Sequence, residues 1–203
     1  MDSGLPQTLV WTPPYKFFTS QQLGITAASQ WPDPSRENEY YVVAFDVLLT
    51  NISGMTMRLG SGTNGKAFIL GGDGRVIGVP DYPQFNNPAT LAASVLTPAE
   101  SFPVSMVSAA YTEWVTHGRP SGEPFVFTTG KSAWWASFWH YASGKQSLWL
   151  VVAVPEGGYT SASRRSELYS IGSDSRLWSV VFPGLGCGTE EASRWNTRRD
   201  SSQ

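Results

Sequence analysis

The first stretch of this sequence that could carry chemistry is Gly71-Gly72-Asp73-Gly74, which lies between two short apolar runs. Such a segment could bind a phosphate, hold a metal ion, or turn the chain between two strands. A phosphate-binding loop requires a Lys-Ser/Thr pair and a following helix, whereas residues 75–79 are predicted as a strand. A calcium loop requires several spaced carboxylates, and this segment offers only Asp73. The sequence therefore favours a hairpin turn in which Asp-Gly takes positive φ.

Asp46 is the second residue of interest, because it interrupts the apolar run YYVVAFDVLL at 40–49. A carboxylate in such a run is costly to bury unless it is paired or hydrogen-bonded. One interpretation is that Asp46 caps the helix that follows or accepts backbone N–H groups. The other interpretation is a contact to a ligand, which arises from the resemblance described below.

The other reactive residues do not form a recognisable catalytic or metal-binding set. His117 and His140 lie far apart in the sequence and make neither a metal site nor a catalytic triad, and His117 is expected to interact with a helix C-terminus. Cys187 is the single cysteine, which excludes an internal disulfide and a cysteine-rich metal site. The sequence contains no G-x-S-x-G elbow. We therefore expect no enzymatic activity, no metal and no cofactor.

The composition narrows the partners further. The 203 residues carry 15% charged side chains and a net charge of -2, so no basic surplus attracts nucleic acid or an anionic membrane. No apolar stretch approaches the length of a membrane-spanning helix, and the sequence MDSGLPQTLV has no features of a secretory signal. Nine Trp and ten Phe predict aromatic packing, an aromatic-lined pocket, or both.

The elements that must position these residues are grouped strands and helices rather than an alternation of the two. This grouping predicts an α+β fold with antiparallel sheets and short covering helices. Strands are expected where β-branched and aromatic residues gather, and helices where apolar residues recur at helical spacing. The expected strands are 24–29, 40–49, 67–70, 75–79, 124–129, 132–142 and 146–155, with residues 8–18 extended; the expected helices are 52–59, capped by Thr50-Asn51, and 104–117.

These elements suggest two modules. Residues 1–82 form the first module, and residues 83–102, rich in Pro, Asn and Ala, are predicted as a linker. Residues 103–170 form the second, smaller module. Residues 171–203 carry Ser, Arg, Gly and Glu without an apolar period, so this tail is predicted to be disordered.

The strand at 132–142 carries an unusual density of aromatic residues. Strand alternation places Trp135 and Trp139 on one face and Trp134 and Phe138 on the other. One pair is expected to pack against the helix at 104–117. The other pair is either a core and dimer contact or an exposed row that could bind sugars.

Four segments of the chain together resemble the double-Cache architecture of bacterial extracytoplasmic sensors, which are PAS-like α+β modules. WTPPYKFF at 11–18 resembles the family's "W-x-x-P-Y" strand, and YYVVAFDVLLTNIS at 40–53 resembles its "G-V-V-G-V-D-I-S-L" strand and helix. GTNGKAFILGGDGRVIGVP at 62–80 resembles "G-x-x-G-x-A-F-L-L-D-x-D-G-R-I-I-A-H-P". SLWLVVAVPEGGY at 147–159 resembles "L-W-L-x-V-V-V-P-E-x-D-F". The resemblance covers residues 8–168.

The resemblance implies a ligand-sensing region of a transmembrane receptor, such as a sensor kinase or nucleotide cyclase, located outside the cytoplasm. In amino-acid-sensing members, an Asp at the position of Asp46 accepts the ligand's ammonium group, and a Tyr at the position of Tyr15 lines the same pocket. We expect Trp11, Tyr15, Phe45 and Asp46 to line a pocket for an amino acid, amine or carboxylate. A homodimer is a further expectation.

The chain also departs from the family pattern. The family's transmembrane segment and first long helix would precede Met1, as would the Arg and Trp-Tyr residues that bind amino acids in many members. After the P-E-x-x-F motif the family continues into a second transmembrane helix, whereas Arg164-Arg165 here leads into a polar sequence. The sequence is therefore expected to be a piece of a receptor, with membrane attachment only through segments outside it.

Two functions from other classes compete with the sensor. A secreted carbohydrate-binding β module is favoured if Trp135 and Trp139 form a flat exposed row, whereas a concave pocket ending at Asp46 favours the sensor. A hydrolase would require a nucleophile and a base within hydrogen-bond reach, and the sequence offers no candidate pair.

Overall fold

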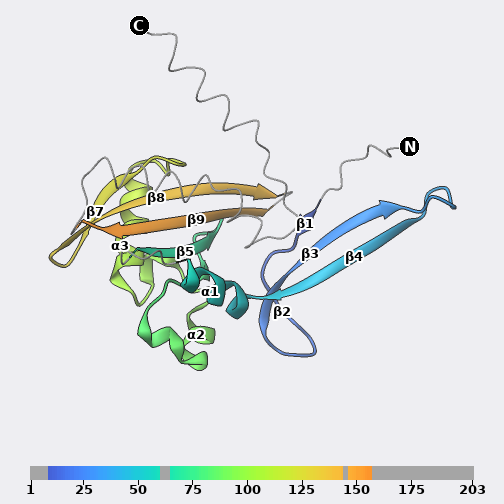
Figure 1. The fold of residues 1–203 in the computed structure, drawn as a ribbon, viewed down its shortest axis with the longest axis horizontal. Helices are drawn as coiled ribbons and strands as arrows, with labels where there is room; N and C mark the ends of the chain where they lie inside the picture. Colours follow the sequence, from blue (N-terminus) through green and yellow to red (C-terminus); the bar gives the residue numbers. More distant parts are fainter. Residues whose placement is uncertain (1–8, 60–64, 144–145, 157–203) are drawn as a thin grey trace, which may run out of the picture.

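The protein folds into two antiparallel sheets, as seen in a computed structural model that describes residues 9–59, 65–143 and 146–156 (Figure 1). The predicted α+β class with antiparallel sheets is confirmed. The first sheet contains β1 (Val10–Trp11), β2 (Tyr15–Lys16), β3 (Leu23–Pro32) and β4 (Tyr40–Leu48). Helix α1 (Leu49–Arg58) follows β4 directly, and the second sheet contains β5 (Lys66–Gly71), β6 (Val76–Gly78), β7 (Phe125–Thr129), β8 (Ser132–Ser143) and β9 (Gln146–Pro155).

The second sheet has the order β6-β5-β9-β8-β7 and contains most of the core. Its central strand β9 is an almost continuous apolar run, because neighbours pair with it on both edges and side chains cover it. Helix α3 (Ser105–Thr116) packs on one face, where Trp114 stacks on Phe138 with ring centroids 4.3 Å apart. The helix therefore packs against Phe138, one member of the Trp134 and Phe138 pair, whereas Trp134 stacks on Phe127.

The glycine-rich segment is a turn, as the sequence favours. The N–H of Gly74 donates to the carbonyl of Gly71 at 2.9 Å, and the N–H of Arg75 donates to the Asp73 carboxylate at 3.2 Å. Positive φ falls on Gly74 alone, at 77°. A Cβ atom there would lie 2.5 Å from the Tyr111 hydroxyl, the far end of a side chain that can shift, so it is the positive φ that favours glycine.

The first sheet is built around β3. Strand β4 pairs with β3 along its whole length, in an unbroken register from Gly24↔Leu48 to Pro32↔Tyr40. The two-residue strands β1 and β2 pair with the other edge of β3. Figure 1 shows the β3–β4 hairpin extending away from the second sheet. This hairpin leaves much of β4 exposed.

The predicted linker at 83–102 is wrong, because these residues form ordered structure that joins the core. They contain the 3₁₀ helices η1 (Pro83–Asn86) and η2 (Ala99–Ser101) and helix α2 (Pro88–Ser94). Phe85 and Phe102 are buried against each other, with ring centroids 5.9 Å apart. The Asn87 side chain caps α2 by accepting the N–H groups of Ala89 and Thr90. A few buried apolar residues therefore order this segment, although its composition is typical of a loop.

The strand pairing also joins segments that the sequence analysis assigned to different modules. Strand β5 lies within the predicted first module of 1–82, yet it pairs with β9 from Lys66↔Ala153 to Gly71↔Leu148. A division at residue 82 therefore cuts the second sheet, because antiparallel pairing can join strands that are distant in sequence. The ends of the predicted second module, 157–170, and the tail at 171–203 lie outside the described residues.

Candidate functional site

A chain of hydrogen bonds connects two of the four predicted ligand-binding residues. The Thr26 hydroxyl donates to Oδ1 of Asp46 at 2.6 Å. Because that bond uses the Thr26 proton, the Tyr15 phenol donates to Thr26 Oγ1, at 2.5 Å. The backbone of Thr26 is held by two bonds to Thr12, whose N–H and Oγ1 face it at 3.0 and 2.9 Å. Tyr15 and Asp46, 31 positions apart in the sequence, thus belong to one cluster.

The strand register explains why these side chains meet. Tyr15 pairs with Gly24, and Thr26 pairs with Asp46, so all of them lie on one face of the first sheet. Below, this face is called the Asp46 face. Its paired positions on the four strands are Val10, Tyr15, Gly24, Thr26, Ala28, Gln30, Pro32, Tyr40, Val42, Ala44, Asp46 and Leu48.

The other two predicted residues lie on the opposite face. Trp11 and Phe45 both pair with Ala27, and side chains of paired residues share a face. Trp11 is buried in the core beside Ile25, whereas Phe45 is exposed. The structure therefore brings Tyr15 and Asp46 together, but it does not place Trp11 and Phe45 in the same cluster.

Asp46 does not cap the helix that follows it. Helix α1 begins at Leu49, its N-cap residue is Leu48, and no side chain hydrogen-bonds to its first turn. Among the paired positions of the Asp46 face there is no Lys or Arg, and Asp46 is its single charged side chain. Its carboxylate makes one hydrogen bond, to Thr26, within the described part of the chain. The remaining oxygen, Oδ2, accepts no hydrogen bond from the described residues, and a carboxylate oxygen can accept from a cation.

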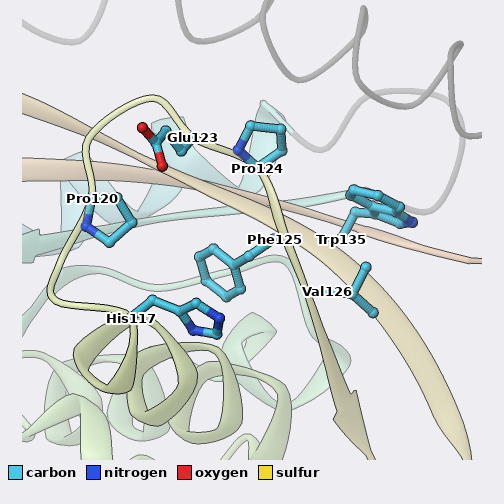
Figure 2. Close-up of a pocket in the computed structure, with 7 residues that line it drawn as sticks. All are labelled: His117, Pro120, Glu123, Pro124, Phe125, Val126 and Trp135. Atoms are coloured by element: carbon cyan, nitrogen blue, oxygen red, sulfur yellow. The ribbon is translucent and has the colours of Figure 1, made fainter.

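A cavity of about 420 Å³ lies at the C-terminal end of α3 (Figure 2). The His117 ring stacks on Phe125 with centroids 5.8 Å apart, and Nδ1 lies 2.8 Å from the Glu113 carbonyl oxygen. The expected contact of His117 with a helix C-terminus is confirmed. The Glu113 carboxylate lies 3.5 Å from His117 Nδ1, whereas Figure 2 shows the Glu123 carboxylate on the loop away from the His117 ring. The remaining lining residues are Pro120, Pro124, Val126 and Trp135.

A second cavity of about 390 Å³ lies between the start of α3 and the β7–β8 turn. Hydroxyl groups contribute to its lining, and the Thr129 hydroxyl donates to Ser105 Oγ at 3.0 Å. Burial raises the pKa of the Tyr82 phenol above its usual value, so this group is neutral at physiological pH. Sequence reasoning missed both cavities because their linings come from loops and strand ends that share no motif. Neither cavity is lined by Trp11, Tyr15, Phe45 or Asp46.

The aromatic residues on the far face of β8 do not form an exposed row. Trp135 pairs with Val154 and Trp139 pairs with Leu150, and both indole side chains are half-buried. Trp135 packs against Val152 and Val154. These two residues therefore offer no flat surface on which sugar rings could stack.

Two further classes of site are absent from the described ranges. No group of three or more His, Cys, Asp or Glu side chains there could hold a metal ion. None of the helices in those ranges combines the length and apolar character needed to cross a bilayer.

Comparison with known proteins gives matches among solved structures only. No protein-family model and no curated protein matches the chain. Three of the matching structures are ligand-binding domains of bacterial chemoreceptors. They are CtaA of Pseudomonas fluorescens with L-serine (16% identity, TM-score 0.44), PctB of Pseudomonas aeruginosa with L-Arg (16%, 0.44) and Tlp3 of Campylobacter jejuni with 4-methylisoleucine (10%, 0.47).

Each match covers part of this chain and part of the receptor domain. The alignments cover 74%, 75% and 75% of this chain and 56%, 58% and 52% of the three receptor domains, in the same order. The chain thus spans just over half the length of the structures it matches. The functional assignment of this chain rests on its own residues.

Proposed function

We propose that this chain belongs to the ligand-sensing region of a bacterial transmembrane receptor, outside the cytoplasm, and that it binds a small molecule carrying an ammonium group. The observation that carries the proposal is the hydrogen-bonded cluster Tyr15–Thr26–Asp46. Two of its members are the residues that the sequence resemblance singles out as ligand contacts. We assign it a binding role, because the paired positions of this face hold no His, Cys or Lys that could complete a catalytic set with the Thr26 hydroxyl and Asp46.

The charge of the Asp46 face determines the class of ligand. A carboxylate ligand would find no Lys or Arg among the paired positions of this face and would meet the negative charge of Asp46. An ammonium group can instead form a charge-assisted hydrogen bond with Oδ2 of Asp46. The hydrogen bond from Thr26 orients the carboxylate, and the Tyr15 hydroxyl in turn donates to Thr26. We therefore narrow the expected ligands to amines and amino acids.

The neighbouring apolar residues favour ligands with an apolar body. Val42 and Ala44 lie on the same face of β4 as Asp46, and Val10 and Ala28 pair beside them. An alkyl or aromatic group attached to the ammonium would cover part of this surface on binding, which contributes about 25 cal/mol per Å² of apolar area removed from water. In the intact receptor, binding would favour one packing of the first sheet and thereby transmit a signal.

The test is a calorimetric screen of this chain with amines, amino acids, carboxylates and neutral sugars, in wild type and in Asp46→Asn. The substitution keeps the shape of the side chain and removes its charge, so amine affinity should fall at least about tenfold, as expected for a charge-assisted bond worth about 1.5–3 kcal/mol. The matched control is Asp81→Asn, because Asp81 is a half-exposed carboxylate that pairs with Lys66 at 3.3 Å beside the second sheet.

The outcomes separate the competing functions. Amine binding that is lost in Asp46→Asn and kept in Asp81→Asn supports the proposal. Carboxylate binding unaffected by Asp46→Asn would contradict the ligand class. Sugar binding that disappears in Trp135→Ala would instead favour the carbohydrate-binding module and overturn the sensor.

A further inference from the structure

The cavity between the start of α3 and the β7–β8 turn is lined entirely by uncharged side chains. None of its lining residues is Lys, Arg, Asp, Glu or His. Its volume of about 390 Å³ falls within the range of pockets that enclose small ligands, roughly 300–1,000 Å³. Below, this space is called the hydroxyl cavity. Its polar groups are a phenol, a carboxamide, three hydroxyls and an indole, which belong to Tyr82, Gln84, Ser105, Thr129, Ser132 and Trp134.

Several of these polar groups have hydrogen-bonding capacity that the protein itself does not use. The Tyr82 hydroxyl, the Gln84 amide and the Ser132 hydroxyl make no hydrogen bond to any residue in the described ranges. The Nε1–H of Trp134 is buried and has no hydrogen-bond partner there either. A buried donor without a partner costs free energy and calls for an explanation. A ligand with acceptor atoms would supply the missing partners.

The walls of the hydroxyl cavity are held by contacts within the protein. The Thr129 hydroxyl donates to Ser105 Oγ at 3.0 Å, which ties the end of β7 to the start of α3. Met106, the next residue of α3, is buried in the core. On β8, the Trp134 ring stacks on Phe127 with centroids 6.4 Å apart. Because these contacts fix the lining before a ligand arrives, little ordering cost is added on binding.

The charges beside the cavity favour an uncharged ligand. Lys66 lies with Nζ 5.2 Å from the centre of the Tyr82 ring, and it pairs with Asp81 at 3.3 Å. These two opposite charges offset each other. A charged ligand would therefore lose its hydration without gaining an ion-pair partner from the lining, which is costly.

We propose that the hydroxyl cavity binds a small uncharged molecule that carries several hydroxyl groups, of the size of a monosaccharide or a cyclic polyol. A hydroxyl group both donates and accepts hydrogen bonds. It can therefore accept from the Tyr82 phenol or the Trp134 indole, and it can donate to the Gln84 carbonyl oxygen or to Ser132 Oγ. Neither an ammonium group, which only donates, nor a carboxylate, which only accepts, matches this mixture as well.

The remaining lining suits the other parts of such a molecule. Val104 and the ring of Trp134 offer apolar contact to C–H groups. No side chain caps the first turn of α3, so backbone N–H groups at this end of the helix add further donors. The site lies beside the second sheet, whereas the ammonium site at Asp46 lies on the first sheet. The two proposals therefore rest on different residues, and either can fail without the other.

The ligand class is tested with three molecules of similar size, namely glucose, glucosamine and glucuronate, and with myo-inositol as the cyclic polyol. Titration calorimetry of the full chain is done in Asp46→Asn, so that the ammonium group of glucosamine does not report on the first sheet. Glucose or myo-inositol should bind, and the two charged sugars should bind at least about tenfold more weakly than glucose. Binding of neither neutral molecule at millimolar concentration, or equal binding of a charged sugar, would overturn the proposal.

The location is tested by removing polar atoms that the fold does not use. The double variant Tyr82→Phe/Gln84→Leu should raise the dissociation constant of the neutral ligand about tenfold or more, because two hydrogen bonds are lost. Its melting temperature should stay close to that of the wild type. The matched control is Tyr111→Phe/Gln22→Leu, which makes the same two chemical changes outside the lining and should leave binding unchanged.

A second measurement locates the ligand without relying on these variants. On addition of the neutral ligand, backbone amide chemical shifts should change most at Ser105, Gly130 and Ser132. Changes confined to other regions, or equal losses of affinity in the two double variants, would rule out the hydroxyl cavity. Sugar binding that is lost in Trp135→Ala and kept in Tyr82→Phe/Gln84→Leu would overturn it as well, because Trp135 lies on the opposite face of β8 from the cavity residue Trp134.

Discussion

The two sheets use the same kinds of residue and bury them very differently. In the second sheet, Val151 and Phe138 on adjacent strands are fully buried, and α3 covers their face through Trp114. In the first sheet, Val43 and Phe45 are exposed, although they sit in a strand of similar length and composition. The difference lies in the neighbours, since strand propensity reflects the packing that a side chain finds rather than the backbone alone.

The comparison also separates scaffold from site. The second sheet has strands paired on both edges of β9 and a helix on one face, which makes it the more completely buried part of the described chain. The first sheet carries the hydrogen-bonded cluster around Asp46, and most of β4 is exposed. Surfaces that bind ligands or partners are expected on the less-covered element that a rigid scaffold holds.

The largest expected difference between the sheets concerns a phenylalanine in each. Phe138→Ala should lower the free energy of unfolding by about 3–5 kcal/mol, because it removes a buried ring and leaves a cavity beside Trp114. Phe45→Ala should change it by about 0.5 kcal/mol or less at a protein concentration where the chain is monomeric, because the ring is exposed. Urea denaturation monitored by circular dichroism measures both. Equal losses would show that β4 is covered in solution.

A smaller contrast in stability is expected between a buried hydroxyl group in α1 and a more exposed hydroxyl group in the first sheet. Ser53 in α1 is fully buried, and its Oγ accepts the Val79 N–H at 3.3 Å while donating to the Leu49 carbonyl at 2.9 Å. Ser53→Ala should therefore cost about 1–3 kcal/mol of unfolding free energy, because the Val79 N–H loses its partner away from water.

The matching change in the first sheet is Thr26→Val. Water can replace the lost hydroxyl at this more open site, so the cost should stay below about 1 kcal/mol. Amine binding should nevertheless weaken, since the carboxylate of Asp46 loses the bond that orients it. Thermal unfolding and calorimetry measure the two effects separately. A larger stability loss from Thr26→Val than from Ser53→Ala would contradict the contrast.

Much of the second sheet could be predicted because its signals are local. The strands expected at 124–129, 132–142 and 146–155 appear at 125–129, 132–143 and 146–155, and the helix expected at 104–117 appears at 105–116. The region 83–102 was missed because its apolar residues are too sparse to show a period. Asn87 followed by Pro88 is nevertheless a helix-start signal, and it marks the beginning of α2.

The candidate site could be predicted only in part. Tyr15 and Asp46 were identified from motifs, but Thr26, which connects them, depends on a register between three strands that alternation does not determine. Phe45 could have been separated from Asp46 on sequence grounds alone. Consecutive residues of a strand point to opposite faces, so these two cannot line one surface of the same sheet.

The smallest expected effect lies at the tip of the β3–β4 hairpin. The pKa of Asp33 lies below its usual value, first because the Ser35 hydroxyl donates to it at 2.6 Å, then because of the Ser35 N–H and the Tyr41 phenol. A depressed folded-state pKa means that the stabilising contribution is present above the unfolded value of about 3.9 and is lost as the pH falls through the folded value.

This acid dependence should be confined to the hairpin. Carboxyl NMR titration should show the pKa of Asp33 rising more in Ser35→Ala than in Tyr41→Phe, because the Ser35 hydroxyl is the larger cause. Asp33→Asn should remove the acid-dependent part of the hairpin's stability while leaving the second sheet unchanged. If Tyr41→Phe instead gave the larger shift, the phenol would be the main partner of Asp33.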